Sequence, residues 1–175
     1  MATRQRKQEM TSEHVIHSSR LDWIEHRHGA AIEAHTASVA NRIGAKTLGY
    51  RLTELLPGKA AFPKHFHFAN EEMFYILEGA GTLRLEKGDL PVEEGDFICI
   101  PGGDQSLAHQ LVNTSSSVLR YLAVSTMCEP DVVIYPDSGQ IAVFAGAAPG
   151  GLKEQRSLEY RASLNWPIAY RPNDK

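Results

Sequence analysis

Short apolar segments recur along the chain from about residue 47 onward, and turn-forming residues separate them. Each segment is of strand length and is rich in β-branched and aromatic residues, a composition typical of strands. The segments are TLGYRLTELL (47–56), EMFYILEG (72–79), GTLRLEKG (81–88), DFICIP (96–101), HQLVN (109–113), SVLRYLAVST (117–126) and VVIYP (132–136). Their spacing predicts an all-β sandwich or barrel.

The flanking regions lack this pattern. SRLDWIEH (19–26) fits a short strand or a helical turn, and GAAIEAHTASVANRIGAK (29–46) fits a loop or a helix. GAAPGG (146–151) marks a break. We therefore expect a partly disordered N-terminal arm over residues 1–45, packed on a barrel over residues 46–145. A C-terminal extension over residues 146–175 is expected to be held, through Trp166 and Tyr170, either to the body of the protein or to a partner subunit.

Composition narrows the class of protein. Hydrophobic residues make up 42% of the chain, charged residues 22%, and the net charge is −3. These values are ordinary for a globular domain and predict no nucleic-acid surface. No apolar run reaches the length of about 18 residues that a membrane span needs, so we expect no membrane segment. Two cysteines, Cys99 and Cys128, are too few for a disulfide framework. We expect Cys99 to be a buried thiol and the setting to be reducing and cytoplasmic.

The candidate chemistry lies in PKHFHFANEEMFYILEG, residues 63–79. On a strand, His65 and His67 face the same side, whereas a helix would turn them to roughly opposite sides. Either Glu71 or Glu72 can share the inward face of the next strand, and alternation alone does not decide between them. His109 opens a later predicted strand. Three imidazoles and one carboxylate suit a first-row transition metal, and six-coordinate geometry would leave two open positions.

A second His-x-His, at His26 and His28, lacks a preceding turn glycine and alternating aromatic residues. We expect these two histidines to be exposed polar residues on the N-terminal arm. The same expectation holds for His14, His17 and His35.

The region around His65 resembles the first signature motif of the cupin superfamily, the double-stranded β-helix proteins. That motif reads Gly, about five residues, His-x-His, three or four residues, Glu, six residues, Gly. Here six residues separate Gly58 from His65, and six separate Glu72 from Gly79. The spacing to Gly79 favours Glu72 over Glu71 as the ligand.

The second cupin motif reads Gly, five residues, Pro-x-Gly, two residues, His, three residues, Asn. Gly95, Pro101 and Gly103 follow this pattern, and three residues separate His109 from Asn113. Five residues instead of two lie between Gly103 and His109, which is a departure in the loop that aims the histidine.

The resemblance implies an all-β cupin double-stranded β-helix, a jelly-roll barrel. It implies one divalent transition metal, Fe, Mn, Ni, Zn or Cu, held by His65, His67, Glu72 and His109. The expected partner is a small-molecule ligand or substrate. The expected function is a metal-dependent enzyme, either a dioxygenase or similar to sugar-phosphate isomerases and epimerases. The alternative is a non-catalytic cupin that binds or senses a small molecule. Pairing through the N-terminal arm would give a homodimer. No catalytic residue is identified beyond the metal ligands.

The cavity beyond the metal is expected to be largely apolar. Asn113 is expected either to support His109 or to end the strand before TSSS (114–117). The apolar candidates are Phe62, Phe74, Ile76, Ile98 and Leu111. The sequence does not fix how Arg84, Arg120 and Tyr121 face, and an inward arginine would favour an anionic or hydroxyl-rich substrate. EPDVVIYPDSGQIAVF (129–144) resembles a segment that follows the barrel in bacterial cupins loosely named for sugar-phosphate isomerases. We expect its residues 135–139 to form a turn that closes the barrel end.

Overall fold

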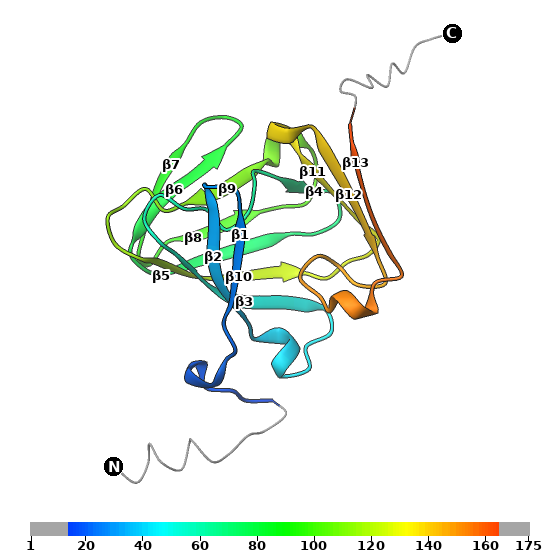
Figure 1. Ribbon diagram of the computed structural model, residues 1–175, viewed down its shortest axis with the longest axis horizontal. Helices are drawn as coiled ribbons and strands as arrows, with labels where there is room; N and C mark the ends of the chain where they lie inside the picture. The colour runs from blue at the N-terminus through cyan, green and yellow to red at the C-terminus, as the bar shows by residue number, and fades with distance from the viewer. Residues whose placement is uncertain (1–13, 165–175) are drawn as a thin grey trace.

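Thirteen β-strands are the main secondary structure of residues 14–164, the part of the chain that the computed structural model describes (Figure 1). The strands are β1 (Ile24–His28), β2 (Ile32–Ser38), β3 (Leu48–Leu55), β4 (Phe66–His67), β5 (Glu72–Glu78), β6 (Ala80–Leu85), β7 (Leu90–Glu93), β8 (Phe97–Ile100), β9 (His109–Val112), β10 (Leu119–Thr126), β11 (Asp131–Tyr135), β12 (Gln140–Ala145) and β13 (Leu158–Ser163). Short 3₁₀ turns connect some of them: η1 (Ser18–Arg20), η2 (Ala40–Arg42), η3 (Gln105–Leu107), η4 (Pro136–Ser138) and η5 (Lys153–Gln155).

One wall of the molecule is a six-stranded antiparallel sheet in the order β1-β2-β3-β10-β5-β8. Its centre is β10, which pairs with β3 on one side and β5 on the other. Strands that are distant in the sequence are therefore neighbours in the sheet, as a jelly roll requires.

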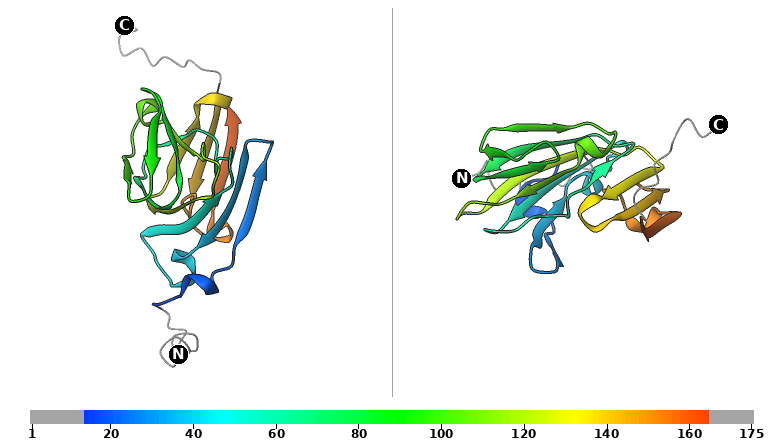
Figure 2. Two further views of the ribbon diagram at one scale, coloured as in Figure 1. Left: turned by 90° about the vertical axis from the view of Figure 1, so that its left-hand side faces the viewer. Right: turned by 90° about the horizontal axis from the view of Figure 1, so that it is seen from above.

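The facing wall contains a four-stranded sheet, β13-β12-β11-β4, and a three-stranded sheet, β7-β6-β9. Figures 1 and 2 show β11, β12 and β13 at one end of the molecule and β6 and β7 at the other. A bridge between His65 and His109 joins β9 to the segment that continues into β4. These connections confirm the predicted all-β jelly-roll barrel.

The core lies between the walls and is built from alternate positions of the strands. Leu55, Ile76 and Leu119 are completely inaccessible to solvent, and they come from β3, β5 and β10. Burial of an aliphatic side chain of this size contributes about 1.5–3 kcal/mol. The predicted cavity residues Phe74, Ile76, Ile98 and Leu111 belong to this core, with Phe62 packed against it.

Residues 29–46 form neither a helix nor a simple loop, because β2 occupies 32–38 and pairs with β3. Alternate small side chains of β2, Ala34 and Thr36, are buried against the sheet. The tertiary pairing therefore decides the conformation of a segment whose small residues fit several states. At the other end, β13 adds an unpredicted strand beside β12. Residues 1–13, Trp166 and Tyr170 lie outside the described residues.

The expectation of a buried Cys99 was wrong, since Cys99 and Cys128 are both free and exposed. Ile98 and Ile100 occupy the inward face of β8, so the residue between them must point outward. Within residues 14–164, no helix has the length and apolarity that crossing a membrane requires.

Candidate metal centre

Two separate parts of the chain meet at the histidines through backbone pairing. The His65 amide donates to the His109 carbonyl at 3.0 Å, and the His109 amide donates back to the His65 carbonyl at 2.9 Å. His67 follows in β4, which pairs with β11. The sheet architecture therefore brings the first and second motifs together before any side chain interacts.

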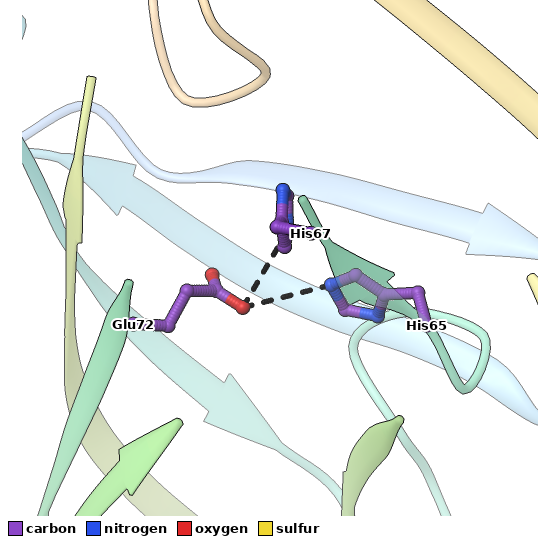
Figure 3. Close-up of side chains that lie close together, drawn as sticks. All are labelled: His65, His67 and Glu72. Atoms are coloured by element: carbon purple, nitrogen blue, oxygen red, sulfur yellow. Dashed lines mark ion pairs between the residues drawn. The ribbon is translucent and has the colours of Figure 1, made fainter. Parts of the chain in front are cut away.

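The side chains converge on one carboxylate oxygen. Glu72 Oε2 lies 2.9 Å from His109 Nε2, 3.6 Å from His67 Nε2 and 3.7 Å from His65 Nε2. Figure 3 shows Glu72 pointing toward the rings of His65 and His67. One ligand atom from each of His65, His67 and Glu72 lies within 4.8 Å of the others, an arrangement that can hold a metal ion. His109 adjoins this cluster, with its ring centroid 4.7 Å from that of His65.

Each of the three rings has its Nδ1 occupied by an acceptor. His65 Nδ1 lies 2.8 Å from the Pro63 carbonyl, and His109 Nδ1 lies 3.1 Å from the Leu107 carbonyl. A carbonyl oxygen cannot donate, so these nitrogens must carry the proton. His67 Nδ1 lies 2.6 Å from a carboxylate oxygen of Asp131. A metal ion would therefore meet the lone pairs of the neutral rings at Nε2, on the side that faces Glu72. His109 Nε2 carries a proton as well when it donates to Glu72 Oε2 at 2.9 Å.

Burial and charge set the protonation of the site. Burial lowers the pKa of His65 to about 3, despite the opposing effect of Glu72. Burial would raise the pKa of Glu72, but the hydrogen bond from His109 and the neighbouring histidines lower it well below its usual range. Burial would also lower the pKa of His67, yet the hydrogen bond to Asp131 and the charge of Glu72 raise it. Glu72 therefore stays ionised, as a metal ligand must.

These residues fit a divalent transition metal. Imidazole nitrogens and a carboxylate are the donors that such ions accept. Donor atoms bound at about 2.1 Å to one ion lie roughly 3–4 Å apart, and the contacts of Glu72 Oε2 with the three Nε2 atoms fall in that range. His67, Glu72 and His109 are all buried, so little solvent competes for them.

A structured turn selects Glu72 instead of Glu71. Asn70 is buried, and its amide group bonds the backbone N–H and carbonyl of Cys128 and accepts from the Thr126 hydroxyl. This anchor starts β5 at Glu72, whose side chain faces inward and is buried. Glu71 remains exposed, with its amide donating to Thr126. The structure thus places Glu72 among the histidines, which agrees with the motif spacing.

The longer loop in the second motif is accommodated by the turn η3. The Asp104 carboxylate accepts from the Ser106 amide at 2.8 Å, which caps η3 at its start. The chain leaves this turn extended at Ala108 and enters β9 at His109. The extra residues therefore form a compact turn, and His109 still reaches Glu72.

Asn113 does not support His109. It is fully buried, and its side-chain amide donates to the carbonyls of Leu55 and Ser117, while Ser115 donates to its oxygen. Asn113 therefore organises the loop after β9. The support that sequence reasoning missed is Asp131, which begins β11, is fully buried and holds His67. No local pattern distinguishes this aspartate, because its partner lies 64 positions away.

Tyr135 also belongs to the site, at the end of β11. Its ring is stacked on His65 with centroids 5.9 Å apart and an interplanar angle of 29°. The turn η4 and the left-handed Gly139 follow it and return the chain to β12. The turn predicted at residues 135–139 is present, and its first residue packs on a histidine.

A cavity of about 340 Å³ opens from the histidine cluster. This volume is at the lower end of the range of about 300–1,000 Å³ for small-molecule sites. His65, His67 and Glu72 lie in one part of its wall, and Phe62, Val133 and Tyr135 contribute apolar surface. Residues of β1, β2 and β3 line another part, including Ile24, Ser38 and Tyr50. The cavity can therefore receive a small molecule next to the cluster.

The sequence did not fix whether Arg84, Arg120 and Tyr121 point into the barrel or out of it. The structure shows both orientations. Arg120 points outward, where it pairs with Glu54 and Glu78, each at 2.8 Å or less. Arg84 is also outward, bonded to Gln110 and near Asp137. Tyr121 faces inward against Phe74, and its burial raises its pKa to about 12. Neither arginine that the sequence offered for the cavity lies in it.

The histidines of the N-terminal segment do not join the cluster. His14, His17 and His28 are exposed as expected, and His35 is half-buried. His26 bonds the Thr36 hydroxyl at 2.8 Å and lines the cavity, although it is mostly exposed. Its role as part of the cavity wall was not expected from the sequence.

Comparison with known proteins agrees with this architecture. A family model for the cupin domain matches residues 51–125. Cupincin from Oryza sativa subsp. indica is 32% identical over 94 residues, which are 51% of this chain and 20% of cupincin. An oxalate-binding protein from Thermotoga maritima is 33% identical over 69 residues, 39% of this chain and 54% of that protein. The chain thus spans only part of the length of these relatives.

Solved structures extend the similarity beyond the matched domain. A candidate sugar phosphate isomerase from Acidithiobacillus ferrooxidans superposes with a TM-score of 0.67 and 28% identity. The superposition covers 79% of this chain and 87% of that chain. The similarity therefore covers a larger share of the chain than residues 51–125.

Proposed function

The chain belongs to the cupin superfamily, and from this premise we propose that it is a metal-dependent protein acting on a small organic molecule. His65, His67, Glu72 and His109 would hold one divalent transition metal, Fe, Mn, Ni, Zn or Cu. The substrate would occupy the cavity of about 340 Å³ beside them. The reaction would be an isomerisation or epimerisation of the sugar-phosphate type, or a dioxygenation.

The convergence of three Nε2 atoms on Glu72 Oε2 carries this proposal. Hydrogen bonds to Glu72 alone do not explain this arrangement, because one carboxylate oxygen would have to serve three buried imidazoles. The Nδ1 contacts orient the three lone pairs toward the same point, which is what a shared cation requires. The opening of this point onto a cavity distinguishes it from a closed structural metal site.

The residues of the chain have separable tasks in such a reaction. When bound, a divalent metal supplies a Lewis acid that polarises a carbonyl or lowers the pKa of a bound hydroxyl group. Asp131 and the two backbone carbonyls keep the rings oriented. Tyr135 and Phe62 give the substrate an apolar wall and limit the access of water. These tasks suit either of the two reaction types.

Metal content after substitution tests the proposed site. We expect His65→Ala, His109→Ala and Glu72→Gln each to lose most of the metal, measured by elemental analysis of protein purified without chelator or nickel resin. Glu71→Gln is the matched control, since Glu71 is exposed and does not face the histidines. Unchanged metal content in the first three variants would remove the four-ligand site.

Turnover assays distinguish the reaction types. Oxygen consumption by iron-loaded protein with diols, catechols and keto acids would identify a dioxygenase. Turnover of sugar phosphates under anaerobic conditions would identify an isomerase or epimerase, a type supported by the similarity to the Acidithiobacillus protein.

A non-catalytic binding protein is the second candidate. The match to the oxalate-binding protein of Thermotoga maritima favours it. Tight binding of a small molecule by the metal-loaded protein, with no turnover in either panel, would support binding as the function.

A further inference from the structure

One arginine enters the cavity next to the metal cluster. Arg51 lies in β3, where it is paired with Ala123 of β10, and Ala123 is paired with Phe74 of β5. Two residues further along these strands, Gly49, Ser125 and Glu72 are paired in the same way. Because residues two apart on a strand share a face, Arg51 is on the same face of the sheet as Gly49 and Glu72.

Arg51 adjoins both the main cavity and a smaller cavity that also touches His65, Glu72 and His109. Its guanidinium carbon lies 4.7 Å from the ring centroid of Phe62, and this stacking holds the planar group in one orientation. The ring of Phe62 in turn meets that of His65 edge-on, with centroids 6.5 Å apart. A ligand between the cluster and Arg51 would therefore contact both.

Arg51 has no anionic partner among the described residues. Its Nε is buried and makes no hydrogen bond within residues 14–164, and no ion pair of this arginine occurs there. Arg156 and Arg161 also line the cavity, but both pair with Glu159, at 2.6 Å and 3.1 Å. Glu72 is the one carboxylate in the described cavity wall, and the histidines surround it. The cavity thus contains a fixed positive charge whose counter-ion the protein does not provide.

We propose that Arg51 binds an oxyanion of the substrate, a carboxylate or a phosphoryl group, and so determines the substrate class. This assignment rests on the proposed function, because the metal would be the second anchor of the same molecule. A guanidinium presents a planar pair of N–H donors that matches two oxygens on one centre. The buried N–H of Arg51 has no hydrogen-bond partner in the described protein, and a substrate without an acceptor group would leave it unsatisfied. Such substrates are therefore disfavoured. Arg51 is thus a specificity-determining residue and selects small anionic molecules.

Anion titration by calorimetry tests this role in the full-length protein with its metal bound. Oxalate probes the carboxylate and inorganic phosphate probes the phosphoryl group, so the two arms separate the two kinds of anion. We expect Arg51→Gln to weaken binding of at least one probe roughly ten- to hundredfold, as loss of a charged hydrogen-bonding group does. Arg51→Lys keeps the positive charge but lacks the two parallel N–H donors of the guanidinium. A loss of affinity between those of Arg51→Gln and the unaltered protein would show that these paired donors contribute to binding.

Arg120→Gln is the matched control, because Arg120 also lies in the central sheet but pairs with Glu54 and Glu78 on the outer face. It should bind both probes like the unaltered protein. Elemental analysis and thermal unfolding of the same samples check that metal and fold are retained. Unaltered protein that contains no metal would contradict the proposed function but not the assignment to Arg51. That assignment is judged by the anion affinities of the Arg51 variants relative to the unaltered protein. Equal affinities in Arg51→Gln and unaltered protein, or binding of neither anion by the unaltered protein, would overturn the assignment to Arg51.

Discussion

In the metal cluster, one hydrogen-bond acceptor at Nδ1 determines which nitrogen of each histidine ring is protonated. The carbonyls of Pro63 and Leu107 fix the protonated nitrogens of His65 and His109. His67 differs, because its acceptor is the carboxylate of Asp131, which burial alone would make harder to ionise. The contact with His67 outweighs that effect and lowers the pKa of Asp131. A charged acceptor makes the ring a stronger ligand than a carbonyl does.

Asp131→Asn isolates this contribution. The amide keeps the size of the side chain and an acceptor oxygen but removes the charge that His67 faces. We expect metal affinity to fall about 10- to 100-fold, measured by competition with a chromophoric chelator, while the fold remains. Asp137→Asn carries the same change at an exposed turn and should leave affinity unaltered. Equal affinity in both variants would show that Asp131 has no influence on the metal.

At the scale of the secondary-structure elements, a glycine allows β5 to connect to β6 beside β10. Gly79 has φ +84°, and a Cβ there would lie 2.4 Å from the carbonyl oxygen of Val118. Both the backbone conformation and the contact with the neighbouring chain therefore require glycine. The motif glycine is thus a packing requirement of the sheet and has no direct contact with the cluster.

Gly79→Ala and Gly58→Ala separate these two requirements. Gly58 has a similar φ of +76°, but a Cβ there would meet nothing within 4 Å. We expect Gly58→Ala to lower the free energy of unfolding by about 1–2 kcal/mol, the cost of a left-handed alanine. Gly79→Ala should lower it by a further amount of about 1–3 kcal/mol, because the backbone must shift. Denaturant unfolding measures both, and equal losses would contradict the steric explanation.

At the scale of the whole molecule, the proposed metal would connect the two walls. His65 and His67 come from the wall that contains β4, His109 from β9, and Glu72 from the six-stranded sheet. An ion that binds only the folded state stabilises it by about 2.7 kcal/mol at a hundredfold excess over its Kd. Chelation should therefore lower the melting temperature by several degrees, and added metal should restore it. Glu72→Gln should show no such response. A melting temperature unaffected by complete metal removal would mean that the ion does not hold the walls together.

The predicted homodimer also belongs to this scale and stays a prediction. β1 is at the edge of the six-stranded sheet, and all five of its residues are exposed, including Ile24. An open edge of this kind can pair with another chain. Light scattering coupled to gel filtration should give twice the chain mass of 19.4 kDa, and a mass of one chain at micromolar concentration would contradict a dimer.

The sequence by itself predicted the β architecture of the barrel, which the structure confirms, and four residues of the candidate metal site, which the structure brings together. Alternation over residues 47–136 is a local property, and two-residue spacing places His65 and His67 on one face wherever the segment is extended. The family spacing to Gly79 then selected Glu72. The strand pattern and the choice of Glu72 could be predicted because each depends only on residues close together in the chain, whereas His109 was assigned through the resemblance of the second motif.

Only the tertiary structure decided the conformation of residues 29–46, the role of Asn113, and the presence of Asp131, Tyr135 and Arg51 around the cavity. Small residues such as Ala34 fit several conformations until β3 offers a partner. Asp131 reaches His67 across 64 positions, and Arg51 gains its importance from an Nε that is buried without a hydrogen-bond partner in the described fold. Burial and charge pairing depend on which distant segments become neighbours, and local patterns contain no record of that.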